Sequence, residues 1–437
     1  MQTHPDAESQ REVLQKALRS GFMGEEDTSV VFYDLDELDS RLQEIESLFP
    51  PASLHTVALK ANPLPSILER VRQAGFGAEA ASHGELTIAH RSGFPAERIV
   101  FDSPVKTENE LRAALELGVH INADSIAELE RIAALLGTTR PRGTIGIRLN
   151  PQVGEGTIES TSVGGRYSKF GVALKENREV LREAFRRFPW LTAVHVHVGS
   201  QGCPLELLIE GARAVTDFAV ETNGLLDRAT APARRITHVD IGGGLPVTYR
   251  VDAPAPHLRE YVKGLKRECP ALFTGTFRLI TEFGRYIYAR SGWAASRVEY
   301  VKHGTSGNTL LVHLGADMFL RRCYDPARWY HSLSLTDAQG NPKSGPVSPY
   351  NVGGPLCFGG DMLARQLPLP HARAGDYLLI HDAGAYTLSM WSRYNSRQLP
   401  KVLGYDKREG LRLLKERESL DEVWRFWSSS GGVRVPR

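Results

Sequence analysis

The sequence lacks any long apolar run. No stretch approaches the roughly 20 apolar residues that a membrane-spanning helix needs. The first 15 residues, MQTHPDAESQREVLQ, are polar and contain no apolar signal core. The sequence therefore predicts a cytoplasmic protein with no membrane association.

Cysteine is scarce, with four residues among 437. The four lie far apart and form no CxxC pair: Cys203, Cys269, Cys323 and Cys357. Neither a zinc site nor a disulfide framework is expected from such spacing in a chain of this length. We therefore expect reduced thiols and no bound metal.

Neither sign of charge dominates. The chain has 53 basic and 51 acidic residues, a net charge of +2. This balance gives no electrostatic basis for binding nucleic acid or an anionic membrane. Apolar residues make up 41% and charged residues 24%, as in ordinary globular proteins. The length predicts two domains, or one barrel with an appended domain.

Eight short β-type runs alternate with amphipathic stretches such as SILERVRQA and NELRAALEL. The runs begin at Thr56, Gly75, Arg98, His120, Thr144, Thr192, Thr237 and Phe277. Strands that alternate with helices are typical of a parallel sheet. Eight of them favour a closed (β/α)8 barrel, as in TIM-like folds, over an open doubly wound sheet.

The pattern changes after Ser291. Segments such as TLLVHLG and DYLLIHDAGAYTL alternate with period two, which predicts an antiparallel β domain. We expect a polar N-terminal extension over 1–28, a strand over 29–35 that joins the β domain, the barrel over 36–290 and the β domain over 291–437.

Chemically active residue types occur at the predicted carboxyl ends of barrel strands, where the active sites of such barrels lie. Lys60 ends the first run, and burial there lowers the pKa of a lysine, which favours its use as a nucleophile. The other features are the imidazole of His197, the glycines Gly242, Gly243 and Gly244, the carboxylate of Glu282, and Arg285.

Each of these features alone has a purely structural explanation. Lys60 could cap a strand, His197 could be a core histidine, and Glu282 could simply pair with Arg285. Together, however, an amine, an anion cradle and an acid suit pyridoxal 5′-phosphate (PLP). That cofactor needs a lysine for its Schiff base, donors for its phosphate and a carboxylate for its ring nitrogen.

Several motifs resemble the fold-type III PLP-dependent decarboxylases. In order they are ALKAN, AASHGEL, SKFGV, HVHVGSQ, DIGGGLP, EFGRY, GGPLCFGGD and DAGAYTLSMWSRYN. The likeness runs from about Val30 to Leu403 and is greatest to the diaminopimelate decarboxylase branch. The resemblance implies a barrel followed by a C-terminal β domain, as in alanine racemase and ornithine decarboxylase.

The resemblance also implies residue roles. Lys60 would carry PLP, His197 would stack on its ring, and Glu282 would hold the ring nitrogen. Cys357 would enter the partner subunit's site and donate a proton after CO₂ leaves, which implies a homodimer with shared active sites. Phosphate ligands would be Ser200, Gly242, Gly243, Gly244, Gly284, Arg285 and Tyr386, and substrate ligands Arg321, Phe358 and Asp361.

Four positions depart from the family pattern. Glu79 stands where aspartate is common, Phe283 replaces a proline, and DSPVKT from Asp102 replaces an NNKT-type turn. Phe358 follows the cysteine where the family has Glu or Asp to meet the distal amine of the substrate. Phenylalanine cannot balance that charge, so we expect an atypical substrate.

The sequence thus predicts a PLP-dependent decarboxylase of an amino acid or amino-acid derivative. Three alternatives stay open at this point. The chain could be a true meso-diaminopimelate decarboxylase that makes lysine, an amino-acid racemase, or a non-catalytic PLP-binding relative.

Overall fold

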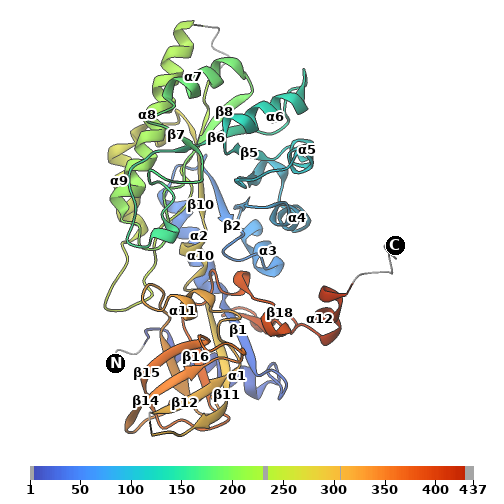
Figure 1. The fold of residues 1–437 in the computed structure, drawn as a ribbon, viewed down its shortest axis with the longest axis vertical. Coiled ribbons are helices and arrows are strands. Elements are labelled where there is room, and N and C mark those ends of the chain that lie inside the picture. Colours follow the sequence, from blue (N-terminus) through green and yellow to red (C-terminus); the bar gives the residue numbers. More distant parts are fainter. Residues whose placement is uncertain (1–3, 230–234, 306, 429–437) are drawn as a thin grey trace. The chain divides into compact units, whose positions relative to one another are not determined.

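The computed structural model describes residues 4–229, 235–305 and 307–428 (Figure 1). The chain forms two compact units. The barrel unit consists of 39–248 and 254–287, and the sheet unit consists of 1–38, 249–253 and 288–437.

Eight parallel strands close into a barrel in the barrel unit. They are β2 (Leu54–Ala58), β3 (Gly77–Ala80), β4 (Ile99–Phe101), β5 (His120–Ala123), β6 (Ile145–Asn150), β8 (Leu191–His195), β9 (His238–Asp240) and β10 (Arg278–Phe283). The β10–β2 and β5–β6 pairings complete the circle, and the short β7 (Val172–Ala173) pairs with β6. The predicted closed barrel is confirmed, and each predicted run overlaps one of these strands.

Helices α3 to α9 lie between consecutive barrel strands, whereas α2 precedes β2 and α10 follows β10 (Figure 1). The helices are α2 (Leu35–Leu48), α3 (Pro65–Gln73), α4 (His83–Arg91), α5 (Glu108–Leu117), α6 (Ile126–Leu136), α7 (Arg178–Arg187), α8 (Leu205–Ala229), α9 (Leu258–Glu268) and α10 (Arg285–Tyr288). Short 3₁₀ turns are η1 (Ala96–Arg98), η2 (Glu159–Thr161) and η3 (Pro270–Leu272).

Hydroxyl side chains fix where three of these helices begin. Ser82, Thr107 and Ser125 each accept the backbone N–H of a glutamate three residues later, at the start of α4, α5 and α6. Such N-caps contribute about 1 kcal/mol each. They also keep the loops after β3, β4 and β5 short, which holds the residues at those strand ends in place.

The described part of the sheet unit contains nine strands. They are β1 (Ser29–Asp34), β11 (Gly292–Lys302), β12 (Asn308–Val312), β13 (Leu333–Thr336), β14 (Val347–Gly353), β15 (Met362–Pro370), β16 (Tyr377–Ile380), β17 (Lys401–Asp406) and β18 (Gly410–Lys415). Most pairings are antiparallel, as predicted, but β1–β17 and β12–β14 are parallel. The unit also contains α1 (Ala7–Arg19), α11 (Leu320–Tyr324), α12 (Leu420–Trp427), η4 (Leu388–Met390) and η5 (Tyr394–Ser396).

Aromatic stacking marks the core of the sheet unit. Phe32 of β1 and Trp293 of β11 are both fully buried, and their rings stack with centroids 4.1 Å apart. Leu14 and Ala17 of α1 belong to the same apolar cluster. The segment before residue 29, expected to be a polar extension, therefore contributes one helical face to this core.

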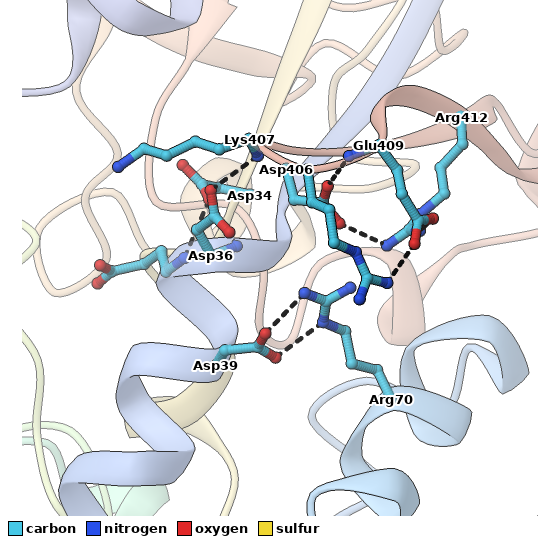
Figure 2. Close-up of polar contacts among 10 residues, drawn as sticks. Asp34, Asp36, Asp39, Arg70, Asp406, Lys407, Glu409 and Arg412 are labelled. Carbon is cyan, nitrogen blue, oxygen red and sulfur yellow. Dashed lines mark hydrogen bonds and ion pairs between the residues drawn. The ribbon is translucent and has the colours of Figure 1, made fainter.

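Aspartates brace the turns around β1 and β17 in the sheet unit (Figure 2). Asp34 accepts the backbone N–H of Asp36 at 3.0 Å and so caps the start of α2. Asp36 in turn accepts the N–H of Lys407 at 3.0 Å, in the turn between β17 and β18. Asp406 pairs with Arg412 at 2.9 Å across that hairpin. These bonds hold the β17–β18 hairpin against the start of α2.

One ion pair in Figure 2 lies within the barrel unit. Arg70 of α3 donates to both carboxylate oxygens of Asp39 on α2, at 2.8 and 2.6 Å.

Within the described ranges, no helix is both long and apolar enough to span a membrane.

Candidate active site

Lys60 lies in a tight turn two residues beyond the end of β2. The sequence predicted that the strand itself reaches Lys60, but β2 ends at Ala58, whose carbonyl accepts the N–H of Ala61 at 3.0 Å. The turn directs the lysine toward the end of β3, where its Nζ donates to Glu79 Oε2 at 2.7 Å. Glu79 is fully buried, whereas the lysine side chain keeps partial access to solvent.

A second carboxyl group pairs with Glu79. Asp102 follows β4 and is held there by its backbone N–H, which donates to the Ala80 carbonyl at 3.1 Å. The two buried carboxyl groups are electrostatically coupled, and each affects the pKa of the other. Burial and the negative Asp102 raise the pKa of Glu79 well above its usual value. Burial opposes ionisation of Asp102 as well, but Lys60 and Glu79 together hold its pKa below its ordinary range.

Glu282, at the end of β10, is a buried acid on the same rim. Burial raises its pKa to about 7. Asp240 lies beside it, and burial together with the Glu282 charge raises the pKa of Asp240 too. Among the described residues, Glu282 Oε1 has no hydrogen-bond partner. A buried carboxyl oxygen in that state costs free energy unless a ligand satisfies it.

His195 completes a compact group with Asp102 and Glu282. One ligating atom from each of these three side chains lies within 4.8 Å of the others. His195 is fully buried, and burial lowers its pKa. The nearest His195–Glu282 approach is 3.6 Å.

His197 lies two residues beyond the end of β8. Its Nδ1 accepts the backbone N–H of Gly243 at 3.2 Å, which fixes the orientation of the ring. Burial lowers its pKa well below the usual value, so the ring is neutral and can accept this bond. The imidazole is thus tied to the glycine segment, as expected for a ring that flanks a ligand.

Close backbone approach explains the three glycines after β9. Gly242 and Gly244 have φ values of +65° and +100°, which other residues rarely adopt. A side chain at Gly243 would overlap the carbonyl of Glu282, and one at Gly244 would overlap that of Gly199. The segment therefore needs bare backbone, the feature by which glycine-rich loops approach anions.

Arg285 and Ser200 lie together on this rim. Both Nε and Nη2 of Arg285 donate to Ser200 Oγ at 3.3 Å, and the arginine is buried. Gly284 precedes it, where a side chain would press on Ala58 and Ala61 beside the lysine turn. A buried guanidinium beside a glycine segment and a hydroxyl has the donor set of a phosphate site.

The remaining predicted residues belong to the sheet unit. Arg321 of α11 lies over two aromatic rings, 4.6 Å from the Trp329 centroid and 5.0 Å from the Tyr386 centroid. Tyr386 has a φ of +56°, an uncommon backbone conformation for a non-glycine residue. The guanidinium of Arg321 therefore packs against two aromatic rings.

Cys357 is exposed, whereas the other three cysteines are buried, and none of the four forms a disulfide. Its backbone N–H donates to Asn395 Oδ1 at 2.7 Å, and its carbonyl accepts the Tyr394 hydroxyl at 3.2 Å. Phe358 stacks on Tyr324 with ring centroids 5.2 Å apart and planes inclined by 23°. The loop therefore carries an exposed thiol next in sequence to the ring that stacks on Tyr324.

Asp361 closes the loop that carries Cys357. Its carboxylate accepts the backbone N–H of Leu356 at 2.7 Å and that of Ala316 at 2.5 Å. These bonds give it a loop-bracing role, and its predicted contact with substrate stays a prediction.

The sequence reasoning did not assign site roles to Glu79, Asp102, His195 and Asp240. A signal for them existed, because all four lie at or just beyond the ends of barrel strands, as Lys60 and Glu282 do. Glu79 and Asp102 were noted only as departures from a family pattern. Their pairing depends on the register of β3 against β4, which one sequence does not reveal.

The barrel residues fit PLP. Glu282 offers the buried carboxyl oxygen that a ring nitrogen needs, the glycine segment leaves room for a phosphate, and Lys60 supplies the amine. Residues 35–289 match the family model described as "Pyridoxal-dependent decarboxylase, pyridoxal binding domain".

The chain belongs to the pyridoxal-dependent decarboxylases.

Relatives within this family are diaminopimelate decarboxylases. The one from Bacteroides thetaiotaomicron is 31% identical over 396 residues, which is 87% of this chain and 96% of the relative. The Helicobacter pylori protein is 32% identical over 404 residues, covering 91% and 95%. Its crystal structure complexed with L-lysine superposes with a TM-score of 0.80 at 30% identity, covering 91% and 96%. The M. jannaschii enzyme superposes with a TM-score of 0.82 at 25% identity, covering 95% and 94%.

This pyridoxal-dependent decarboxylase is accordingly an enzyme of the carboxy-lyase class that uses PLP. The predicted family, fold and cofactor are confirmed.

Proposed function

We propose that this enzyme decarboxylates an amino acid or amino-acid derivative whose distal end differs from that of diaminopimelate. The reaction is supported by three features at the same rim of the barrel: an amine (Lys60), a buried acid (Glu282) and a glycine segment. The observation that supports the altered substrate is the aromatic pair formed by Phe358 and Tyr324.

Bound PLP supplies an electron sink for the electrons left behind when CO₂ departs. Lys60 would hold the cofactor through its amine, and the imidazole of His197 would flank it. Its phosphate would be held by Ser200, Gly242, Gly243, Gly244, Gly284, Arg285 and Tyr386.

Glu282 would hold the ring nitrogen of the cofactor with its buried carboxyl group. Its pKa of about 7 lets the carboxyl keep or donate a proton near neutral pH. Because the group is buried, its interaction with a bound ring nitrogen would be shielded from water and strong. His195 approaches the carboxyl group to 3.6 Å, and Asp240 lies beside it.

Cys357 donates the proton that replaces the lost carboxylate. Its exposed position on a braced loop suits a residue that enters the site of a second subunit. The enzyme is then a homodimer with two shared active sites, each completed by the thiol of the partner.

Substrate selection falls to Arg321 and Phe358. Arg321, held between aromatic rings, binds a carboxylate of the substrate. Phe358 presents an apolar surface in place of a carboxylate, so a distal ammonium loses its counter-charge. The preferred substrate carries an apolar, acylated or carboxylate-bearing distal end.

A decarboxylation screen over amino acids and their N-acyl and dicarboxylic derivatives tests the proposal. CO₂ release and optical rotation are measured on the same samples. We expect CO₂ release with a substrate whose distal end is not a free amine. Racemisation without CO₂, or no turnover with any substrate by enzyme that has bound PLP, would contradict the proposal.

A further inference from the structure

Asn122 of β5 reaches across the interior of the barrel to a strand that is not its neighbour. Its Nδ2 donates to Asp240 Oδ2 of β9 at 3.1 Å, although β6 and β8 lie between β5 and β9 in the barrel. Both residues are buried, with exposed fractions of 1% for Asn122 and 0% for Asp240. Buried polar groups that lose a partner cost free energy, so this bond fixes both side chains.

Gly146 of β6 leaves the space that this crossing needs. It pairs with Asn122 in the register of β5 and β6. A Cβ atom at Gly146 would lie 2.5 Å from Asn122 Oδ1, which is too close for two such atoms. A glycine inside a strand often marks a close approach of this kind. The intervening strand therefore carries no side chain at the point where the amide passes.

His120, also on β5, fixes the direction in which the amide points. Its Nε2 lies 2.8 Å from Asn122 Oδ1, and burial lowers its pKa to about 3, so the ring is neutral. Because the amide nitrogen donates to Asp240, the amide oxygen is the acceptor and the His120 Nε2 carries the ring proton. The amide cannot rotate without losing both bonds, so its N–H stays directed at Asp240.

Asp240 extends this constraint to the end of β10. Its Oδ1 accepts the backbone N–H of Gly242 at 2.9 Å. The carbonyl of Gly242 in turn accepts the backbone N–H of Glu282 at 2.8 Å. A continuous series of hydrogen bonds thus connects Asn122 to the backbone of the buried acid.

We propose that Asn122 is a positioning residue that, through Asp240 and Gly242, places the carboxyl group of Glu282 for the ring nitrogen of PLP. This inference rests on the proposed role of Glu282. A functional group must be held within about 0.5 Å of its working position by the residues behind it. Loss of the Asn122 amide therefore weakens the contact between Glu282 and the ring nitrogen more than the other contacts of the cofactor.

The binding of PLP and of 1-deazapyridoxal 5′-phosphate to PLP-free enzyme tests this proposal. The second molecule has a C–H group in place of the ring nitrogen and cannot form the contact with Glu282. The ratio of the two Kd values, measured by equilibrium dialysis, therefore isolates that contact. We expect wild type to prefer PLP, and Asn122→Ala to reduce this preference at least about threefold, as for groups coupled within one hydrogen-bond network. A general loosening of the barrel would weaken both molecules equally and leave the ratio unchanged.

Asn223→Ala is the matched control. Asn223 is a buried asparagine of α8 that donates to the Ile236 carbonyl at 2.9 Å and accepts the Ile236 N–H at 2.8 Å. Its variant likewise loses one donated and one accepted hydrogen bond, but both bonds go to the backbone before β9. It should keep the wild-type ratio. An unchanged ratio in Asn122→Ala, or an equal reduction in Asn223→Ala, would overturn the proposal.

The two levels of inference fail in different ways. Wild-type enzyme that binds both molecules equally contradicts the proposed role of Glu282, and the role of Asn122 with it. A wild-type preference that Asn122→Ala retains contradicts only the role of Asn122. If circular dichroism shows that Asn122→Ala is unfolded, Asn122→Ser provides the same test, because serine leaves a smaller space and is too short to reach Asp240. We expect the same reduction in the ratio, and an unmoved ratio overturns the proposal.

Discussion

Replacing Phe358 with glutamate should convert the enzyme toward diaminopimelate. In the wild type a distal ammonium would face an aromatic ring instead of a carboxylate. An unpaired charge in a closed site costs several kcal/mol, and a cation–π contact returns only about 0.5–2 kcal/mol of this. The glutamate supplies the missing counter-charge. A gain of only about 1.4 kcal/mol in transition-state binding raises kcat/KM tenfold.

The substitution should leave the protein folded. Phe358 is 38% exposed, so the ring gives up only part of the roughly 1.5–3 kcal/mol of a fully buried side chain. Loss of its stacking on Tyr324 adds about 0.5–1.5 kcal/mol. The sum stays below the stability of an ordinary domain.

The assay is kcat/KM for meso-diaminopimelate, measured by CO₂ release. Phe358→Leu serves as the control, since it removes the ring without adding a charge. We expect weak activity in wild type and in Phe358→Leu, and at least about a tenfold gain in Phe358→Glu. Efficient turnover by wild type that the glutamate does not improve would refute the reasoning.

Three further predictions follow from the structure. Cys357→Ala should retain PLP but lose about 10²–10⁴-fold in turnover, the usual value of a general acid, and mixing it with Lys60→Ala subunits should restore part of the activity; confirmed mixed dimers without recovery would exclude shared sites. The folded pKa of Glu282, about 7, lies above its ordinary value of 4.5, so the folded state holds this proton more tightly and the free energy of unfolding should fall as pH rises from about 4.5 to about 7, by up to about 3 kcal/mol. Urea unfolding of PLP-free protein should show this slope in wild type and a smaller one in Glu282→Gln; equal slopes would contradict the assignment. Gly244→Ala should lose PLP affinity in an equilibrium titration, because its φ of +100° and the backbone beside it leave no room for a methyl group, whereas Gly224→Ala within α8, where nothing lies within 4 Å, should bind normally and gain up to about 1 kcal/mol of stability; equal affinities would contradict the glycine cradle.

The sequence predicts the barrel and one rim of the site because periodicity and strand order carry that information. Lys60, Glu282 and the glycine segment each follow a β-type run, and parallel strands bring their ends to one rim. The sequence predicts the end of β2 two residues late, because Leu59 continues the apolar run while the backbone already turns. Such turns depend on backbone bonds that residue pattern does not specify.

Contacts between distant side chains are what the sequence could not reveal. The Glu79–Asp102 pair depends on strand register, and two acids in separate motifs give no sign that they are electrostatically coupled. The stacking of Phe358 on Tyr324 joins a loop residue to the last residue of α11, 34 positions away in the sequence. In the sequence, Phe358 by itself indicated a change of substrate. The structure adds that its ring stacks on Tyr324.

Borohydride reduction of PLP-loaded enzyme, followed by peptide mapping, tests the central claim most directly. The reduction converts the Schiff base into a stable bond, so the labelled peptide identifies the lysine. The geometry of the barrel rim predicts that the label lies on Lys60 and that Lys60→Ala yields no specific label. A label on any other lysine of the wild-type enzyme would contradict the account.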